Sequence, residues 1–289
     1  MCPENPVLFP TMRPTFIEQG HSFVDRIEDC DVVLWDLHTR IANYSDNDIQ
    51  YLLSNKIPTV SFDEWDRGNM SNDKWPFPFT VQQSYVFVEL LFNKIKNIHF
   101  CRLVDKTQKW PDNVFPYEKP ISYEQPPVSK EELFNREWDI VFVANHAPSR
   151  QLIADAINND GRLKCLTMIG AEKIPFEKFV EIHKTGKLFI SSSGGGFTDE
   201  RVQCLFSIAG IIRQRTNQLL LNDFTNSHDC IRISSPTTKD DLDYIYQIVN
   251  DKDRLYEIYL NGYNFVKTHY SQEYFANYYL ETMRKNNII

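Results

Sequence analysis

The stretch that decides the fold is Lys187-Leu-Phe-Ile-Ser-Ser-Ser-Gly-Gly-Gly-Phe-Thr-Asp-Glu-Arg201. It begins with an apolar run typical of a buried strand, passes through three consecutive glycines, and continues into the polar start of a helix near Thr198. Glycines let backbone N–H groups approach a ligand closely, and the N-terminus of the following helix attracts negative charge. Strand, glycine loop and helix in this order predict a parallel α/β sheet that binds an anion at the carboxyl ends of its strands.

The same alternation of apolar runs and helical patterns continues through the second half of the chain. There we expect strands at 139–144, 163–169, 187–192, 211–213 and 230–233. We expect helices at 149–159, 176–184, 239–250 and 253–269, with another beginning near 198. A last helix over 272–285 carries more aromatic side chains than one narrow face needs, and we expect it to pack across both domains. This half therefore predicts a doubly wound domain.

The first half repeats the pattern with weaker signals. Strands are expected at 31–36, 57–62 and 98–104, and helices at 45–55 and 82–96. Residues 63–68, Asp-Glu-Trp-Asp-Arg-Gly, have the composition of a polar loop, and residues 105–135 carry five prolines and little periodicity. We therefore expect an N-terminal domain over 1–120, a linker over 121–135, a C-terminal domain over 136–270 and the last helix over 271–289.

Composition and charge exclude several classes of protein. With 289 residues, 42% of them hydrophobic, the chain can bury two cores and is not of the disordered class. It has 31 Lys and Arg against 39 Asp and Glu, a net charge of −8, and no basic cluster, which disfavours a nucleic-acid partner. The longest apolar stretch, Tyr85–Phe92, has eight residues and contains Glu89, whereas a membrane span needs about 20.

The N-terminal residues and the cysteines suggest a compartment. The first fifteen residues contain four prolines and no apolar run, so they do not have the pattern of a signal peptide. The six cysteines lie far apart and form no Cys-x-x-Cys pair, which is typical of free thiols rather than a disulfide framework. We therefore expect a soluble, cytoplasmic protein without a membrane span.

Two arginines stand at predicted helix starts, each just after a predicted strand. Arg201 follows the glycine loop, and Arg150 closes the segment Asn145-His-Ala-Pro-Ser-Arg150 after the strand at 139–144. An arginine in the first turn of a helix opposes the helix dipole by a few tenths of a kcal/mol unless an anion neutralises it. Together the two residues predict a diphosphate held between neighbouring loops. The alternative for Arg201 is a mobile loop whose helix happens to contain an arginine, and Arg150 taken alone is better interpreted as an exposed helix residue.

Other nucleotide and metal motifs are absent or misplaced. Asp199 stands where the third glycine of a dinucleotide fingerprint would fall, and no Gly-Lys-Ser/Thr triplet of a P-loop occurs. Asp-x-Asp pairs, which can hold Mn²⁺ or Mg²⁺ against a diphosphate, need to follow an apolar strand. Asp29/Asp31, Asp241/Asp243 and Asp251/Asp253 do not. We therefore expect no metal, with arginines and helix dipoles stabilising the charge of the leaving group.

From Asp139 onward, the chain resembles the donor domain of GT-B glycosyltransferases, most of all the capsule-associated xylosyltransferase and protein O-glucosyltransferase family and the exostosin-like glycosyltransferases. The likeness covers about half of the chain. It is carried by Ser149-Arg150, Ile169-Gly170, the glycine loop, the run from Thr198 to Gly210, and the closing run from Asp251 to Val266. The resemblance implies an α/β fold of GT-B architecture, with two Rossmann-like domains facing across a cleft and a C-terminal helix crossing back.

The resemblance also implies an activity. A sugar, xylose or glucose first, would move with inversion from a UDP-sugar to a hydroxyl of a glycan or glycoprotein, with the UDP-sugar as co-substrate and no cofactor. Carried over position by position, the donor-binding residues would be Asn145, Arg150, Gly194, Gly195, Gly196, Phe197, Thr198 and Arg201. Many relatives have a glutamate, apt for the ribose, where this chain has Cys204, so ribose recognition differs here.

Inversion requires a general base that deprotonates the acceptor hydroxyl as it attacks. The resemblance implies a base in the N-terminal domain, and two acids that follow predicted strands fit, Asp63 first and Asp36 second. The neighbouring polar and aromatic side chains suit sugar hydroxyls and rings, and we expect them to bind the acceptor: His38, Glu64, Trp65 and Asp66. Acids after strands also commonly cap turns, so the assignment stays open between these residues.

Three alternatives remain. One is a metal-dependent, single-domain glycosyltransferase that uses Asp29 and Asp31. Another is a module that binds a nucleotide sugar without turnover, with which Cys204 is consistent. The last, a glucosyltransferase acting on nucleic-acid bases, conflicts with the charge of −8.

Overall fold

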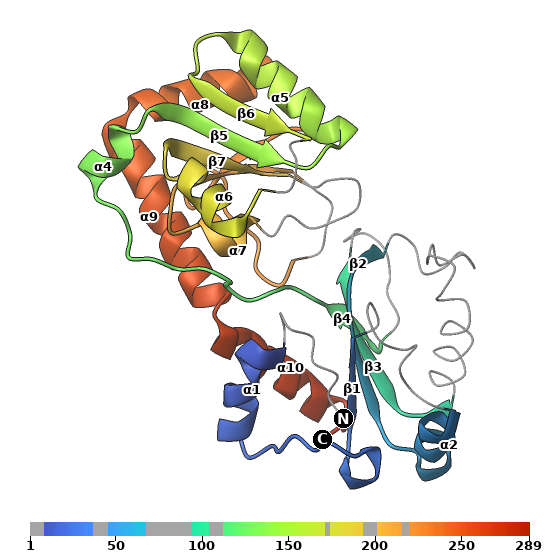
Figure 1. Ribbon diagram of the computed structural model, residues 1–289. Coiled ribbons are helices and arrows are strands. Elements are labelled where there is room, and N and C mark those ends of the chain that lie inside the picture. Colours follow the sequence, from blue (N-terminus) through green and yellow to red (C-terminus); the bar gives the residue numbers. More distant parts are fainter. Residues whose placement is uncertain are drawn as a thin grey trace. The chain divides into compact units, whose positions relative to one another are not determined.

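The computed structural model describes residues 9–36, 46–67, 94–103, 112–170, 174–192, 201–215 and 220–289. The chain divides into two compact units, each with its own parallel sheet (Figure 1). Unit 1 consists of Met1–Lys119, Asn217–Leu221 and Gln272–Ile289, and unit 2 of Pro120–Thr216 and Asn222–Ser271. The last helix of the chain therefore belongs to the unit in which the chain begins.

The sheet of unit 1 has four parallel strands in the order β1-β2-β3-β4. They are β1 (Val33–Asp36), β2 (Thr59–Arg67), β3 (Asn97–Leu103) and β4 (Val114–Pro116). The described helices of this unit are α1 (Phe9–Glu18), the 3-10 helix η1 (Ile27–Asp29), α2 (Asp46–Asn55) and α10 (Gln272–Lys285). Helix α2 lies between β1 and β2 in the chain, and α1 packs against α10 (Figure 1).

Buried aromatic rings join α10 to the middle of this sheet. The ring of Tyr279 on α10 lies 5.2 Å from that of Phe62 on β2 and 4.7 Å from that of Phe100 on β3. Its hydroxyl donates a hydrogen bond of 2.6 Å to the carbonyl oxygen of Glu118. Ring pairs of this kind add about 0.5–1.5 kcal/mol each to the effect of burying their area. A helix that comes last in the sequence is thus part of the core of unit 1.

The sheet of unit 2 has five parallel strands in the order β6-β5-β7-β8-β9. They are β5 (Trp138–Ala144), β6 (Cys165–Ile169), β7 (Gly186–Ser191), β8 (Gly210–Gln214) and β9 (Ile231–Ile233). The helices are α4 (Lys130–Phe134), α5 (Pro148–Asp160), α6 (Phe176–His183), α7 (Arg201–Leu205), α8 (Lys239–Asn250) and α9 (Lys252–His269). Figure 1 shows these helices around the sheet.

The first two connections of this sheet run in opposite directions along it. Helix α5 connects β5 to β6, and α6 connects β6 back to β7 on the other side of β5. Because such crossovers are right-handed, α5 and α6 cover opposite faces. On the α5 face, side chains of α5, α8 and α9 form one apolar cluster with strand residues that include Phe142, Ile190 and Ile212. The sheet is therefore covered on both faces, as parallel sheets require.

Residues 63–67 continue strand β2, so the prediction of a loop there was wrong. After an irregularity between Asp63 and Asp66, the strand pairs Asp66 with Arg102 and Arg67 with Leu103 of β3. Acidic residues have weak strand propensity, but pairing with a neighbouring strand outweighs it.

The stretch 105–135 is more ordered than its five prolines indicate. Its described part contains β4, which pairs with β3 and ends on Pro116 at the edge of the sheet, where a missing N–H is tolerated. It also contains α4, where the side chain of Ser129 accepts a hydrogen bond from the N–H of Glu132. Neither element, nor α1, was predicted, because the prolines around β4 and α4 indicated a linker and α1 contains Pro14.

The strands and helices predicted between 139 and 285 are present, and their ends differ from the prediction by at most two residues. The exception is the helix expected near 198, which begins at Arg201, after residues 193–200 that are not described. Most of the helix predicted over 82–96 also lies outside the described residues. In the part of the chain that is described, no helix has both the length and the apolar character to cross a bilayer.

Candidate functional site at the carboxyl ends of β5 and β7

The strand order of unit 2 reverses between β5 and β7. Open α/β sheets bind their ligands at such a reversal, outside the carboxyl ends of the strands, because the flanking helices lie on opposite faces there. Here β5 ends at Ala144 and β7 ends at Ser191. The residues that follow these two positions are therefore the first candidates for a binding site.

Arg150 lies at this reversal, in the first turn of α5, and only 9% of it is exposed. Its Nη1 donates to the carbonyl oxygen of Asn145 at 3.4 Å, and its Nη2 donates to that of Ser192 at 3.5 Å. Asn145 follows β5 and Ser192 follows β7, so one guanidinium contacts the ends of both strands. A positive charge is thereby held where the two loops begin.

Arg201 approaches the carboxyl end of β5 from the helix that follows the glycine loop. It is the first residue of α7, after the glycine loop, and its Nε donates to the carbonyl oxygen of Val143 on β5 at 3.1 Å. The side chain thus reaches from the end of β7 across to β5. The structure brings together the two arginines that the sequence singled out, since both contact the last residues of β5 or the loop after it.

The N-terminus of α5 adds to the positive potential. Ala147 is its N-cap and provides no side-chain hydrogen bond, and Pro148 occupies the first helical position. The unsatisfied N–H groups of a helix start carry about half a positive charge. Asn145 and His146, between β5 and this helix start, are exposed. The backbone of this loop and the side chains of Asn145 and His146 are therefore accessible to a ligand beside the buried guanidinium of Arg150.

The loop after β6 packs closely against this segment. Gly170 has φ +74°, and its N–H donates to the carbonyl oxygen of Ala144 at 2.9 Å. A Cβ at Gly170 would lie 3.4 Å from the Cβ of His146. This close approach positions the His146 backbone at the carboxyl edge.

The other predicted donor-binding residues lie outside the described residues: Gly194, Gly195, Gly196, Phe197 and Thr198. Cys204, which stands where relatives have a glutamate, is buried in α7, and its Sγ donates to the carbonyl oxygen of Arg201 at 3.5 Å. It is turned into its own helix and presents no polar group of the kind that binds a ribose.

Two buried polar side chains at this edge were missed by sequence reasoning. Ser192 is 1% exposed and follows β7, and Gln214 is 5% exposed and ends β8. The only sequence signal is a polar residue at the end of an apolar strand, which is too common to single out a site.

In unit 1 the register places the backbones of the two candidate bases near each other on adjacent strands. Asp36 is the last residue of β1 and pairs with Phe62, so the backbone of Asp63 is the next position on β2. Glu64, Trp65 and Asp66 follow along β2 through the irregularity, and such bulges are frequent near active sites because they redirect side chains. His38 lies outside the described residues.

Two Asp-x-Asp pairs have structural roles. Asp241 forms a capping box with Thr238, and Asp243 pairs with Arg162. Asp251 caps α9, and Asp253 pairs with Lys130. Asp29 and Asp31 come before β1, at the amino end of the sheet. Among the described residues, no group of three His, Cys, Asp or Glu side chains could hold a metal ion.

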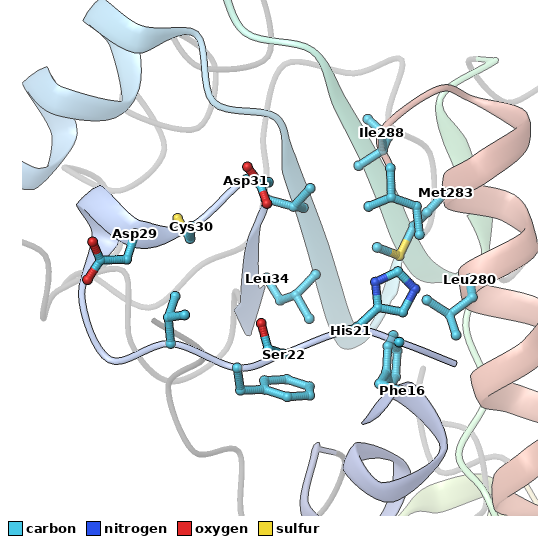
Figure 2. Close-up of a pocket in the computed structure, with 15 residues that line it drawn as sticks. Phe16, His21, Ser22, Asp29, Cys30, Asp31, Leu34, Leu280, Met283 and Ile288 are labelled. Atoms are coloured by element: carbon cyan, nitrogen blue, oxygen red, sulfur yellow. The ribbon is translucent and has the colours of Figure 1, made fainter. Parts of the chain in front are cut away.

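A cavity of about 440 Å³ lies in unit 1 beside α1, the start of β1 and α10 (Figure 2). Phe16, Leu280 and Met283 form apolar walls around His21, and burial, followed by the charge of Arg284, lowers the pKa of that imidazole. Asp29 and Asp31 also contribute to the lining. The cavity is at the amino ends of the strands, opposite to the edge where such sheets bind substrates, and we assign it no ligand.

Comparison with solved structures agrees with this architecture. The crystal structure of TarM superposes on 87% of this chain and 54% of its own, with a TM-score of 0.57 and 10% identity. A variant of S. aureus TarM in complex with fondaparinux, alpha-GlcNAc-glycerol and UDP gives a TM-score of 0.51 over 78% of this chain and 50% of its own, with 13% identity. The fold is that of the GT-B glycosyltransferases. The predicted α/β, GT-B fold class is therefore confirmed.

The likeness is one of fold. The chain spans about half the length of TarM. No family model matches the sequence, and a search of curated proteins finds no relative. The α1,3-fucosyltransferase structure superposes with a TM-score of 0.46 and 13% identity over 87% of this chain and 76% of its own.

Proposed function

We propose that this chain is an inverting, metal-independent glycosyltransferase that moves a sugar, xylose or glucose first, from a UDP-sugar to a hydroxyl of a glycan or glycoprotein. The proposal rests on one observation: Arg150 at the start of α5 and Arg201 at the start of α7 both donate hydrogen bonds to backbone carbonyls at the carboxyl end of β5, and Arg150 also reaches Ser192 after β7. The choice of xylose or glucose rests on the resemblance of the sequence to the xylosyltransferase and O-glucosyltransferase family.

The chemistry of the leaving group explains why two arginines suit this place. When the bond between the anomeric carbon and the diphosphate breaks, UDP takes the electron pair and its negative charge increases. Two guanidinium groups and the α5 N-terminus stabilise that charge without any metal ion, since they are already oriented before the reaction. TarM, which shares the fold, has been crystallised with UDP.

The transfer itself forms one bond and breaks another. The acceptor hydroxyl oxygen bonds to the anomeric carbon from the face opposite the diphosphate, and the hydroxyl proton passes to a carboxylate. We propose Asp63, or Asp36 beside it, as that base, with Glu64, Trp65, Asp66 and His38 binding the acceptor. One base is sufficient, because inversion takes place in a single displacement.

Ligand binding tests the proposal first. UDP at about 100 times its dissociation constant should add roughly 2.7 kcal/mol to the free energy of unfolding and raise the melting temperature by several degrees. A thermal-shift series with UDP and UDP-sugars, with and without EDTA, measures this. We expect stabilisation that EDTA leaves unchanged. A response that requires a divalent metal would contradict metal independence, and no response to any nucleotide would contradict the proposal.

Arginine variants identify the site. We expect Arg201→Ala and Arg150→Ala each to weaken UDP binding by at least tenfold, the order expected for a lost charge-assisted hydrogen bond. Arg162→Ala is the matched control, because Arg162 precedes β6 at the amino end of the sheet, where it pairs with Asp160 and Asp243. Equal UDP affinity of Arg201→Ala and Arg162→Ala, measured by calorimetry, would contradict the assignment.

A module that binds a nucleotide sugar without turnover is the second candidate, and the buried Cys204 favours it. Release of UDP from a UDP-sugar in the presence of acceptor glycans distinguishes the two. A chain that binds the donor tightly and never releases UDP would be such a module.

A further inference from the structure

Gln214 has a buried side-chain oxygen without a partner in the described part of the chain. It is the last residue of β8 and is 5% exposed, and the atom concerned is its Oε1. Buried side-chain oxygens are hydrogen-bonded in the large majority of cases, so this one calls for a donor such as an ordered water or a ligand.

The strand register places Gln214 next to the candidate donor site. Strands β7 and β8 are parallel and pair Ser191 with Arg213, so the next residues along, Ser192 and Gln214, are neighbours. The carbonyl oxygen of Ser192 accepts a hydrogen bond from Arg150. One strand spacing, about 4.8 Å, therefore separates Gln214 from a residue that contacts the buried guanidinium.

Side-chain alternation puts Gln214 on the same face as Arg150. Ile212, two residues earlier on β8, belongs to the apolar cluster formed with α5 and α8. Residues two apart on a strand point to the same face, so Gln214 also points to the α5 face. Arg150 is a residue of α5. Arg150 and the amide of Gln214 thus both lie at the carboxyl edge of the sheet, on the face that α5 covers.

A second buried oxygen lies in the loop that follows the next strand. Thr237 comes four residues after the end of β9, and within the described residues its buried Oγ1 has no hydrogen-bond partner. The carboxyl side of this sheet therefore carries a cation, an amide and a hydroxyl. The amide and the hydroxyl are neutral and can both accept and donate hydrogen bonds.

We propose that Gln214 binds a hydroxyl of the sugar ring in the donor. This rests on the proposed function, in which the diphosphate lies at Arg150 and Arg201. The oxygen of Gln214 requires a hydrogen-bond donor, which a hydroxyl group supplies. In a sugar nucleotide, hydroxyls stand on both rings that flank the diphosphate, the ribose and the transferred sugar. We assign Gln214 to the transferred sugar, so that it affects the affinity for the UDP-sugar and not that for UDP.

Calorimetry with UDP, UDP-glucose and UDP-xylose separates these roles. In Gln214→Met, which keeps the side-chain length and removes the amide, we expect UDP affinity within about twofold of wild type. We expect the affinity for the preferred UDP-sugar to fall about tenfold, the effect of one hydrogen bond to a buried group. Gln247→Met is the matched control, because Gln247 is exposed in the middle of α8, and we expect it to leave both affinities unchanged.

The outcomes of this calorimetry distinguish the inference from the proposed function. If Gln214→Met binds the UDP-sugar as wild type does, or loses UDP and UDP-sugar affinity equally, the inference is overturned while the proposed function stands. If wild-type protein binds neither ligand, it is the proposed function that fails.

A second measurement does not depend on the variant folding well. Wild-type protein should bind one deoxy analogue of the preferred sugar nucleotide about tenfold more weakly than the parent. Gln214→Met should show no further loss with that analogue. Equal affinity of wild type for the parent and every deoxy analogue would overturn the inference.

Discussion

At the scale of single residues, one glycine allows a helix to lie directly on a loop. Gly262 is in the middle of α9, where glycine is normally unfavourable. A Cβ at this position would lie 2.5 Å from the carbonyl oxygen of Asp229, which is a backbone atom and cannot move away without shifting the loop. The absence of a side chain therefore sets the distance between α9 and the loop before β9.

We expect Gly262→Ala to lower the free energy of unfolding by about 1–3 kcal/mol, because overpacking outweighs the better helix propensity of alanine. Asn264→Ala is the control, since Asn264 is exposed on the same helix and the substitution only improves propensity. Urea denaturation of both variants measures the difference. An unchanged or more stable Gly262→Ala protein would show that the loop moves freely.

The arginines and the glutamine show how far sequence reasoning reaches at this scale. Arg150 and Arg201 could be singled out because an arginine at a helix start is electrostatically unusual. Gln214 could not, because its significance comes from the register with β7 and from the burial of its oxygen, and both depend on contacts between distant segments.

At the scale of elements, α8 begins with a fully formed capping box. Asp241 accepts hydrogen bonds from the N–H and the hydroxyl of Thr238, and from the N–H and hydroxyl of Ser234. Burial alone would raise the pKa of Asp241, but these hydrogen bonds together outweigh it and lower the pKa. The carboxylate is therefore favoured in the folded state.

The lowered pKa of Asp241 gives a prediction with a definite sign. Its stabilising effect is fully present above the unfolded pKa of about 3.9 and is lost as the pH falls through the lower folded value. We expect Asp241→Asn to be less stable than wild type by about 1 kcal/mol at pH 7, with the difference shrinking toward pH 3. Thermal unfolding from pH 7 to pH 3 tests this, with Asp240→Asn as control. A difference that is independent of pH would contradict it.

The elements that sequence patterns predicted carry a clear hydrophobic signal, either a continuous apolar run or a helical period. Strands β5 and β7 have the first and helices α8 to α10 have the second, and their ends were placed within two residues. Strand β4 has three residues, and the second half of β2 is mostly acidic. Both exist because β3 offers them backbone partners, and such pairing leaves no mark in the local sequence.

At the scale of the whole molecule, the first segment of unit 1 ends at Lys119, and its last segment begins at Gln272. The two units have separate apolar cores, and Tyr279 contributes to that of unit 1 although it follows all of unit 2. Position in the sequence is therefore a poor guide to which core a residue stabilises.

We expect Tyr279→Ala to cost about 3–5 kcal/mol in unit 1, because it leaves a cavity between α10 and the sheet. Hydrogen exchange followed by mass spectrometry should show faster exchange in β2 and β3, and unchanged exchange in β5 and β7. Tyr279→Phe, which removes only the hydrogen bond to Glu118, should show a smaller change. Faster exchange in β5 and β7 alone would contradict the division into units.

The membership of α10 in unit 1 has a consequence for synthesis on the ribosome. About 150 residues separate Lys119 from Gln272, and at about 5–20 residues per second their translation takes roughly 8 to 30 s. During that interval the sheet of unit 1 has emerged without the helix that covers Phe62 and Phe100. Unit 2 can therefore complete its core before unit 1 does. The strands of unit 1, although they are synthesised first, are then the ones that most need a chaperone.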